Sequence, residues 1–286
     1  MQLPSRWLPG CALLLGLCLS ARAQTAAPDT AATPARRGSF TASLSAGNNS
    51  SFFGRTQARR YPYAAAELSY KTASGFWGSA LSYNLFDTTS FIDETDLSLG
   101  WDGDLSKRVD ASLSYSRFVF ADNSPLVKSS VRNSLDGYLG LDWGYVYSRL
   151  NAAYVFGDSG DFFLILDNSR NFEWERVLQP SAYLSLEPRV SVTAGTQRFA
   201  QTSLVQQQQR GNGPVRPPRG PGRTTTVVTE LSRFAVLSYE LRVPLTYSLG
   251  AWSAQVAWRY NVPVNLLPDD VSEARSFVTA SLSLTL

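Results

Sequence analysis

Histidine is absent from this sequence of 286 residues. Its side chain is the usual general base and proton shuttle near neutral pH, and it is the commonest metal ligand in proteins. The absence argues against histidine-dependent hydrolases and against metal sites that depend on histidine.

Cysteine is also missing from most of the chain, because both cysteines lie within the first 23 residues. This segment has a basic start at Arg6, an apolar run from 11 to 19 and an Ala21-Arg22-Ala23 cleavage pattern, which are the parts of a secretory signal peptide. Its apolar run is too short to span a bilayer as a helix, which needs roughly 20 residues. We therefore expect residues 1–23 to be removed, leaving a chain from Gln24 that can form no disulfide.

A large excess of charge of either sign is lacking. Without Arg6 and Arg22, the chain has 24 basic and 23 acidic residues. A nearly neutral chain has no global attraction for nucleic acid or for a charged membrane surface. We expect no nucleic-acid partner.

The sequence also lacks helical periodicity, since no long segment repeats its apolar residues every 3.6 positions. This excludes helical repeats and alternating strand and helix units. Residues 24–38 are rich in Ala, Thr and Pro and have no periodic pattern, which predicts a disordered periplasmic leader.

From Phe40 onward, apolar and polar residues alternate, a pattern typical of strands with one apolar and one polar face. Most of the alternating segments are longer than an average globular strand and match the length of a tilted strand that crosses a membrane. The predicted strands are 40–46, 63–71, 76–85, 94–101, 109–120, 134–142, 145–156, 174–186, 190–199, 234–247, 251–261 and 276–286.

The connections between these strands alternate in length. Long or medium connections are expected at 47–62, 86–93, 121–133, 157–173, 200–233 and 262–275. Short ones are expected at 72–75, 102–108, 143–144, 187–189 and 248–250. All short turns would then lie at one end of the sheet, as in transmembrane barrels with short periplasmic turns and long extracellular loops. The alternative for the same strands is a soluble β-sandwich or lipocalin-like barrel, and a soluble sandwich would show no such asymmetry.

The final segment is the clearest of the strands. It places five apolar side chains on one face, namely Val278, Ala280, Leu282, Leu284 and Leu286. With the signal peptide and the asymmetric loops, the chain resembles bacterial outer-membrane β-barrel proteins of the porin-like type. The resemblance implies an all-β fold, a transmembrane antiparallel up-and-down β-barrel of about twelve strands over residues 39–286, in the outer membrane of a double-membrane bacterium. It also implies that the last strand is an assembly signal for the barrel-insertion machinery, although such signals usually end in Phe.

Aromatic residues flank most of the predicted short turns and suggest an interfacial girdle. The candidates are Tyr70, Trp77, Trp101, Trp143, Tyr145, Tyr247 and Trp252. Small and aliphatic residues, including Leu81 and Leu85 of one strand, are expected to face lipid between the interfaces.

The opposite faces of the strands are polar and are expected to line the lumen. The candidates are Glu67, Lys71, Glu94, Asp96, Asp110, Asp136, Asp142, Arg149, Glu240, Arg242, Gln255 and Arg259. Such charges could set the ion selectivity of an open channel, or they could pair across a narrow lumen and plug it. Glu240, Arg242 and Arg259 are the best candidates for an internal salt-bridged cluster.

Three further stretches allow more than one interpretation. A Gln-rich, Pro-rich and Arg-rich loop at about 201–223 is expected to be disordered, either as a tolerated insertion or as a contact for anionic glycolipid or a surface partner through Arg210, Arg216, Arg219 and Arg223. Arg117 breaks the apolar face of its strand, which suggests an interfacial cation, a bulge or a contact with lipid phosphate. The apolar run 162–166, between Asp161 and Asp167, is placed in an outer loop, as a strand extension or a constriction.

No metal or cofactor is expected. Asp102-Gly103-Asp104 and similar Asp-rich turns lack the spacing of a calcium loop and fit ordinary turn chemistry.

The sequence favours a monomeric passive channel for small solutes. The alternative is a closed structural or adhesive barrel whose long loops bind surface partners. A barrel-embedded hydrolase would have to work without histidine, so we expect no enzyme.

Overall fold

The computed structural model describes residues 38–56, 59–86, 88, 90–122, 131–157, 160–206, 224–267 and 270–286, with the backbone alone at 198–206 and 224–232. The predicted signal peptide, nearly all of the predicted leader and residues 207–223 of the Arg-rich loop, with its four arginines, lie outside these residues. Residues 201–206, predicted as loop, belong to a strand.

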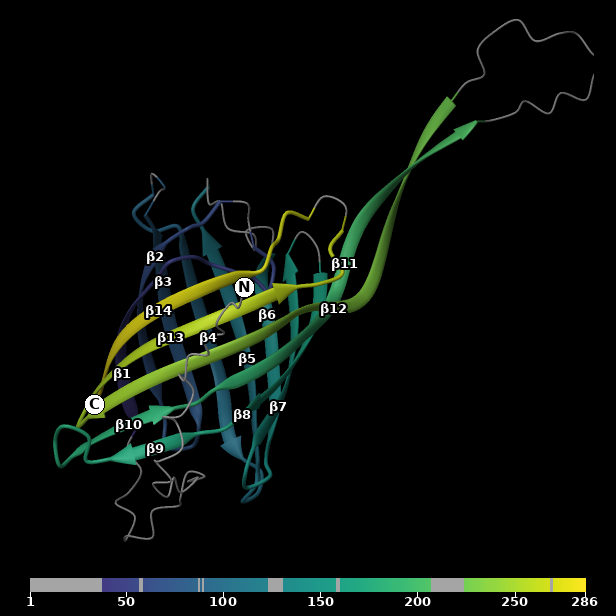
Figure 1. The fold of residues 1–286 in the computed structure, drawn as a ribbon. Helices are drawn as coiled ribbons and strands as arrows, with labels where there is room; N and C mark the ends of the chain where they lie inside the picture. Colours follow the sequence, from purple (N-terminus) through teal and green to yellow (C-terminus); the bar gives the residue numbers. More distant parts are fainter. Residues whose placement is uncertain are drawn as a thin grey trace, which may run out of the picture.

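Fourteen strands form a single antiparallel sheet (Figure 1). They are β1 (Ser39–Gly47), β2 (Tyr63–Lys71), β3 (Phe76–Leu85), β4 (Glu94–Asp104), β5 (Val109–Phe120), β6 (Val131–Asp142), β7 (Tyr147–Gly157), β8 (Gly160–Ser169), β9 (Phe172–Glu175), β10 (Ala182–Leu186), β11 (Arg189–Gln206), β12 (Thr224–Leu249), β13 (Trp252–Pro263) and β14 (Arg275–Thr285). No helix in the described part of the chain is long and apolar enough to cross a membrane.

Twelve of these strands close into a barrel, which confirms the predicted strand number. β1 to β8 pair in chain order, β8 pairs with β11, and β11 to β14 continue the ring. β14 then pairs with β1, from Thr41 opposite Thr285 to Gly47 opposite Thr279. A closed ring leaves no strand edge with unpaired backbone N–H and C=O groups. Such an edge is not tolerated in a membrane, because lipid cannot form hydrogen bonds with these groups.

The two ends of the barrel differ as predicted for most connections, but the predicted long loop 157–173 is wrong, because β7 ends at Gly157 and β8 begins at Gly160 at the extracellular end. At one end β14 finishes and the connections 72–75, 105–108, 143–146 and 250–251 are short. At the opposite end β11 and β12 run on past the rim as a long hairpin (Figure 1). Barrels of this type keep their short turns in the periplasm, so the hairpin end is extracellular.

The eighth strand of the barrel is not the predicted one. The apolar run 162–166 is the centre of β8 and crosses the wall, so its predicted placement in an outer loop is wrong. Residues 174–186, predicted as a strand, instead form most of the short β9–β10 hairpin. This hairpin lies in the periplasmic connection 170–188 and pairs with the end of β12, below β11. Residues 187–188 of the predicted turn 187–189 are therefore only the end of a longer connection, and Arg189 is the first residue of β11.

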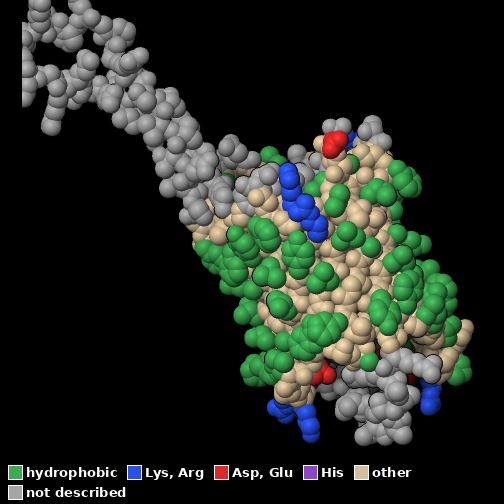
Figure 2. All heavy atoms as spheres, turned by 180° about the vertical axis from the view of Figure 1, so that it is seen from behind, with side chains coloured by type: hydrophobic (Ala, Val, Ile, Leu, Met, Phe, Trp, Pro, Cys, Tyr) green, Lys and Arg blue, Asp and Glu red, His purple; other side chains and the backbone are tan. Residues whose placement is uncertain are grey.

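The outer surface of the barrel is apolar. On the face seen in Figure 2, hydrophobic side chains are spread over the wall between the two ends, with few charges. The exposed aliphatic residues include Leu44, Leu68, Leu97, Leu99, Leu113, Leu135, Leu139, Leu150, Leu241, Leu245, Val256, Val278 and Leu282. Such a continuous band on a closed barrel would be unstable in water, and it identifies the chain as an outer-membrane β-barrel.

Most of the predicted periplasmic girdle lies on the outside of the wall or on the turns, but Trp77 does not. The Trp77 indole donates a hydrogen bond of 2.8 Å to Asp102 Oδ1 inside the barrel. Trp77 and Leu81 pair with the inward-facing Lys71 and Glu67 on β2, so the face of β3 that carries Trp77, Leu81 and Leu85 points inward. The outward aromatic residue at this turn is Phe76, opposite Trp101. The phase predicted for β3 is therefore wrong.

Candidate functional site in the lumen

The first extracellular connection, residues 48–62 and here called loop 1, folds into the mouth of the barrel. Its tip is a tight turn in which Phe52 and Arg55 exchange two backbone hydrogen bonds of 2.9 Å. The two central residues, Phe53 and Gly54, have φ of 46° and 81°, as a type I′ turn requires. A Cβ on Gly54 would overlap the Ser238 side chain of β12, so only glycine fits this close approach.

Loop 1 is anchored on the side of β13 and β14. The Gly54 carbonyl accepts a hydrogen bond of 2.8 Å from Asn261 Nδ2, and Asn261 is fully buried. Arg55 donates to the Val264 carbonyl at 3.1 Å and pairs with Asp270 at 3.2 Å. Burial lowers the pKa of Arg55, and Asp270 opposes this shift. Since both partners of the pair are largely buried, the Asp270 charge is what makes burial of the Arg55 cation tolerable.

The tip of loop 1 reaches across to the opposite wall. Val131, Ala153 and Val155 of β6 and β7, Phe163 of β8 and Leu237 of β12 form a buried apolar cluster, and Phe52, Phe53 and Phe118 pack against it. The Phe53 and Phe163 rings stack with their centroids 3.8 Å apart. Loop 1 therefore narrows the extracellular part of the lumen with aromatic rings.

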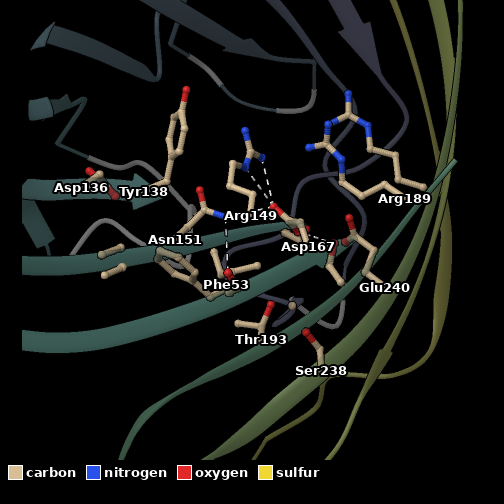
Figure 3. A pocket seen from close by; sticks show the side chains of 18 of the residues that line it. Phe53, Asp136, Tyr138, Arg149, Asn151, Asp167, Arg189, Thr193, Ser238 and Glu240 are labelled. Atoms are coloured by element: carbon tan, nitrogen blue, oxygen red, sulfur yellow. Dashed lines mark hydrogen bonds and ion pairs between the residues drawn. The ribbon is translucent and has the colours of Figure 1, made fainter. Parts of the chain in front are cut away.

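Below Phe53 the lumen opens into a polar cavity of about 340 Å³ (Figure 3). On one side Asp167 of β8 is the acceptor for three neighbouring side chains. Arg149 donates to it at 3.0 Å, Asn151 at 2.9 Å and Ser191 at 2.6 Å. The Arg149 guanidinium also lies over the Tyr138 ring, 5.2 Å from its centre. This side of the cavity is a fixed, internally neutralised network.

The side formed by β11 to β13 is richer in arginine. Arg259 pairs with Glu240 at 3.6 Å, which confirms part of the predicted cluster. Arg189 pairs with Glu187 at 2.9 Å. Arg242 donates to Gln255 Oε1 at 3.4 Å and forms no ion pair with any carboxylate in the described residues. The cavity lining thus contains four arginines against Asp136, Asp167 and Glu240.

A wider vestibule of about 1580 Å³ occupies the periplasmic end. Tyr138 lines both this space and the cavity, so the two adjoin. Asp102 anchors the vestibule wall, because it accepts hydrogen bonds from Lys71 at 2.9 Å, Trp77 at 2.8 Å and Ser112 at 2.8 Å. Asp110 accepts a hydrogen bond of 2.9 Å from the Tyr147 hydroxyl.

The twelve predicted lumen residues all lie on inward faces of their strands, but in different places. Asp136, Arg149, Glu240, Arg242 and Arg259 line the cavity. Lys71, Asp110 and Asp142 line the vestibule. Glu94 and Asp96 are buried in the β4 wall, Glu67 faces Leu81 of β3, and Gln255 bonds to Thr246 and Arg242.

Several residues of the site were missed by the sequence analysis. Asp167 lies in the run assigned to a loop, and Arg189 lies in a predicted turn. Phe53 has no period-two signal because it is in a loop. The one available signal was local, since Phe-Gly at positions 53 and 54 suits a tight turn.

No family model matches the chain, and no curated protein is similar enough in sequence to match it. Solved outer-membrane barrels resemble it in structure. The NanC porin gives a TM-score of 0.47 at 10% identity, over 86% of this chain and 100% of the porin. An outer membrane channel from Pseudomonas putida F1 gives 0.47 at 10% identity, over 92% and 100%.

LpxR from Salmonella typhimurium gives a TM-score of 0.43 at 10% identity, over 85% of this chain and 99% of that protein. Identities this low and TM-scores below 0.5 do not transfer a function.

Proposed function

We propose that this barrel is a passive channel for small polar solutes, narrowed at its extracellular end by loop 1. The observation that carries the proposal is the adjoining pair of polar spaces inside the wall. A barrel whose role was purely structural would gain stability by filling this volume with packed or fully paired side chains.

The distribution of charge supports passage of polar or charged solutes. Arg189, Arg242 and Arg259 line the cavity on the β11 to β13 side and Asp136 lines it on β6, while Asp102 and Asp110 line the vestibule on β4 and β5. Opposite charges held on facing walls of a narrow, low-dielectric passage act on ions and dipoles that cross it. Because the two signs are nearly balanced, we expect weak rather than strong ion selectivity.

A closed barrel is the competing function, and the stack of Phe53 on Phe163 is the observation that favours it. The two functions differ in whether water and ions reach the cavity from both sides. The absence of cysteine from residues 39–286 allows a direct test, because one introduced thiol is then unique.

Ser114 lines the cavity, so a thiol in the Ser114→Cys variant should react with a water-soluble, charged methanethiosulfonate reagent and lower the current across a planar bilayer. Ser276→Cys on the lipid-facing side of β14 is the matched control, and its current should not change. A current that is insensitive to modification of Ser114→Cys would contradict passage through this cavity.

A further inference from the structure

Arg117 is a cation on the lipid-facing side of the wall. It is exposed on β5, where the register pairs it with Leu97 of β4 and Asn133 of β6. Leu97 belongs to the exposed aliphatic band, with 48% of its surface accessible. The guanidinium therefore stands outside the barrel and takes no part in the lumen.

Asn133 holds the Arg117 side chain in place without neutralising it. Arg117 Nη1 donates to Asn133 Oδ1 at 2.9 Å, and the Tyr115 hydroxyl donates to the same oxygen at 2.7 Å. The Asn133 amide in turn donates to the Phe156 carbonyl at 3.3 Å, which fixes its orientation. Within the described residues no carboxylate forms an ion pair with Arg117, so the other N–H groups of its guanidinium keep their capacity for an anion.

The depth of this cluster corresponds to lipid headgroups. Arg117 lies three residues before the extracellular end of β5 at Phe120. Aromatic residues lie nearby on the wall: Tyr115 is on the same strand, and the stacked pair Tyr154 and Phe156, with centroids 5.5 Å apart, is on β7, where Phe156 is paired with Asn133. Aromatic belts mark the interface of a bilayer. In Figure 2, basic side chains stand among hydrophobic ones just below the upper rim of the wall.

We propose that Arg117, Asn133 and Tyr115 form a binding site for the phosphate group of an outer-leaflet glycolipid. The planar guanidinium matches the geometry of a phosphate and can donate two parallel hydrogen bonds to it. A β-bulge between Val131 and Asn133 sets the start of β6 in this register and turns the Asn133 side chain outward beside Arg117. The site is independent of solute passage, since it lies on the other side of the wall.

The test measures glycolipid retained by the folded barrel in detergent, with native mass spectrometry as the readout. The probes are lipopolysaccharide with a phosphorylated lipid A and the same preparation after enzymatic dephosphorylation. We expect the phosphorylated form to bind, and Arg117→Gln to weaken it about tenfold, the loss typical of one charge-assisted hydrogen-bonded contact. Tyr115→Phe should give a smaller loss.

Arg176→Gln, at the tip of the periplasmic hairpin, is the matched control and should bind like the wild type. Heat-modifiable migration in gels shows that each variant is folded before it is compared. Equal binding by Arg117→Gln, or equal binding of the dephosphorylated lipid, would overturn the site. Competition by millimolar inorganic phosphate would also overturn the glycolipid assignment, because the cluster would then bind phosphate as a free ion.

Discussion

The ring of Phe53 lies flat on the ring of Phe163, with 5° between their planes and 3.8 Å between their centroids. An aromatic pair of this kind contributes about 0.5–1.5 kcal/mol beyond its buried area. The left-handed backbone of Phe53 costs about 1–2 kcal/mol, so the stack roughly offsets the strain of the turn. The position of loop 1 in the lumen therefore depends on its polar anchors as well as on the stack.

Removing Arg242 should shift the ion selectivity of the channel toward cations. Its guanidinium forms no ion pair in the described residues. Its charge is therefore not offset by a carboxylate, and it acts more strongly on mobile ions than the charge of a paired arginine does. The reversal potential of Arg242→Gln in a potassium chloride gradient measures the shift. Arg176→Gln, outside the lumen, is the control and should keep the wild-type value. An unchanged reversal potential in Arg242→Gln would show that ions do not pass this arginine.

Replacing Asp270 should loosen loop 1. Asp270→Asn leaves the Arg55 cation buried beside a neutral partner, which we expect to destabilise the folded loop by about 1.5–3 kcal/mol. Limited proteolysis in detergent should then cut within 48–62 faster than in the wild type. Asp104→Asn, at the exposed periplasmic end of β4, should leave the cleavage rate unchanged. Equal rates for all three proteins would contradict the anchoring role of the Arg55–Asp270 pair.

A charge at Leu166 should block membrane assembly. Leu166 is 44% exposed in the middle of β8, where arginine at the bilayer midplane costs about 2–4 kcal/mol. The folded fraction of Leu166→Arg, measured by heat-modifiable migration after refolding into lipid, should therefore fall. Leu178→Arg at the tip of the β9–β10 hairpin, where the leucine is 89% exposed, should fold normally. Normal assembly of Leu166→Arg would contradict the placement of residues 162–166 in a membrane-spanning strand.

Changing the end of the chain tests the proposed assembly signal. Leu286 exchanges backbone hydrogen bonds of 3.0 and 2.8 Å with Phe40 of β1, so the last residue is part of the closing seam. We expect Leu286→Phe to insert faster into membranes containing the insertion machinery, and deletion of residues 284–286 to insert more slowly. If the deletion leaves the insertion rate unchanged, the strand is not an assembly signal.

The barrel itself could be predicted because lipid on one side and water or polar groups on the other impose a period of two. This pattern identified the closing strand 276–286 and the bounds of β2, β3 and β5. β8 was not predicted as a strand because its inward residues Phe163 and Ile165 are apolar. Phe163 faces the buried cluster below loop 1, so the strand is apolar on both faces and shows no alternation.

The phase of β3 could not be read from its own residues for a related reason. The side chains of Trp77 and Leu81 are apolar like those that face lipid, but both point into the lumen. Trp77 is held inside by the Asp102 carboxylate, which lies on β4, 25 positions further along the chain. The conformation of loop 1 could not be predicted either, because its inward fold depends on contacts with Asn261, Val264 and Asp270 near the other end of the chain.

Single-channel conductance in planar bilayers distinguishes an open channel from a closed barrel. The wild-type barrel should give discrete current steps, and Phe53→Ala should give larger ones because the ring that narrows the mouth is removed. Phe91→Ala, in a different outer loop and 86% exposed, should match the wild type. Correctly folded and inserted wild-type and Phe53→Ala barrels that both pass no current would contradict the channel and leave a closed barrel.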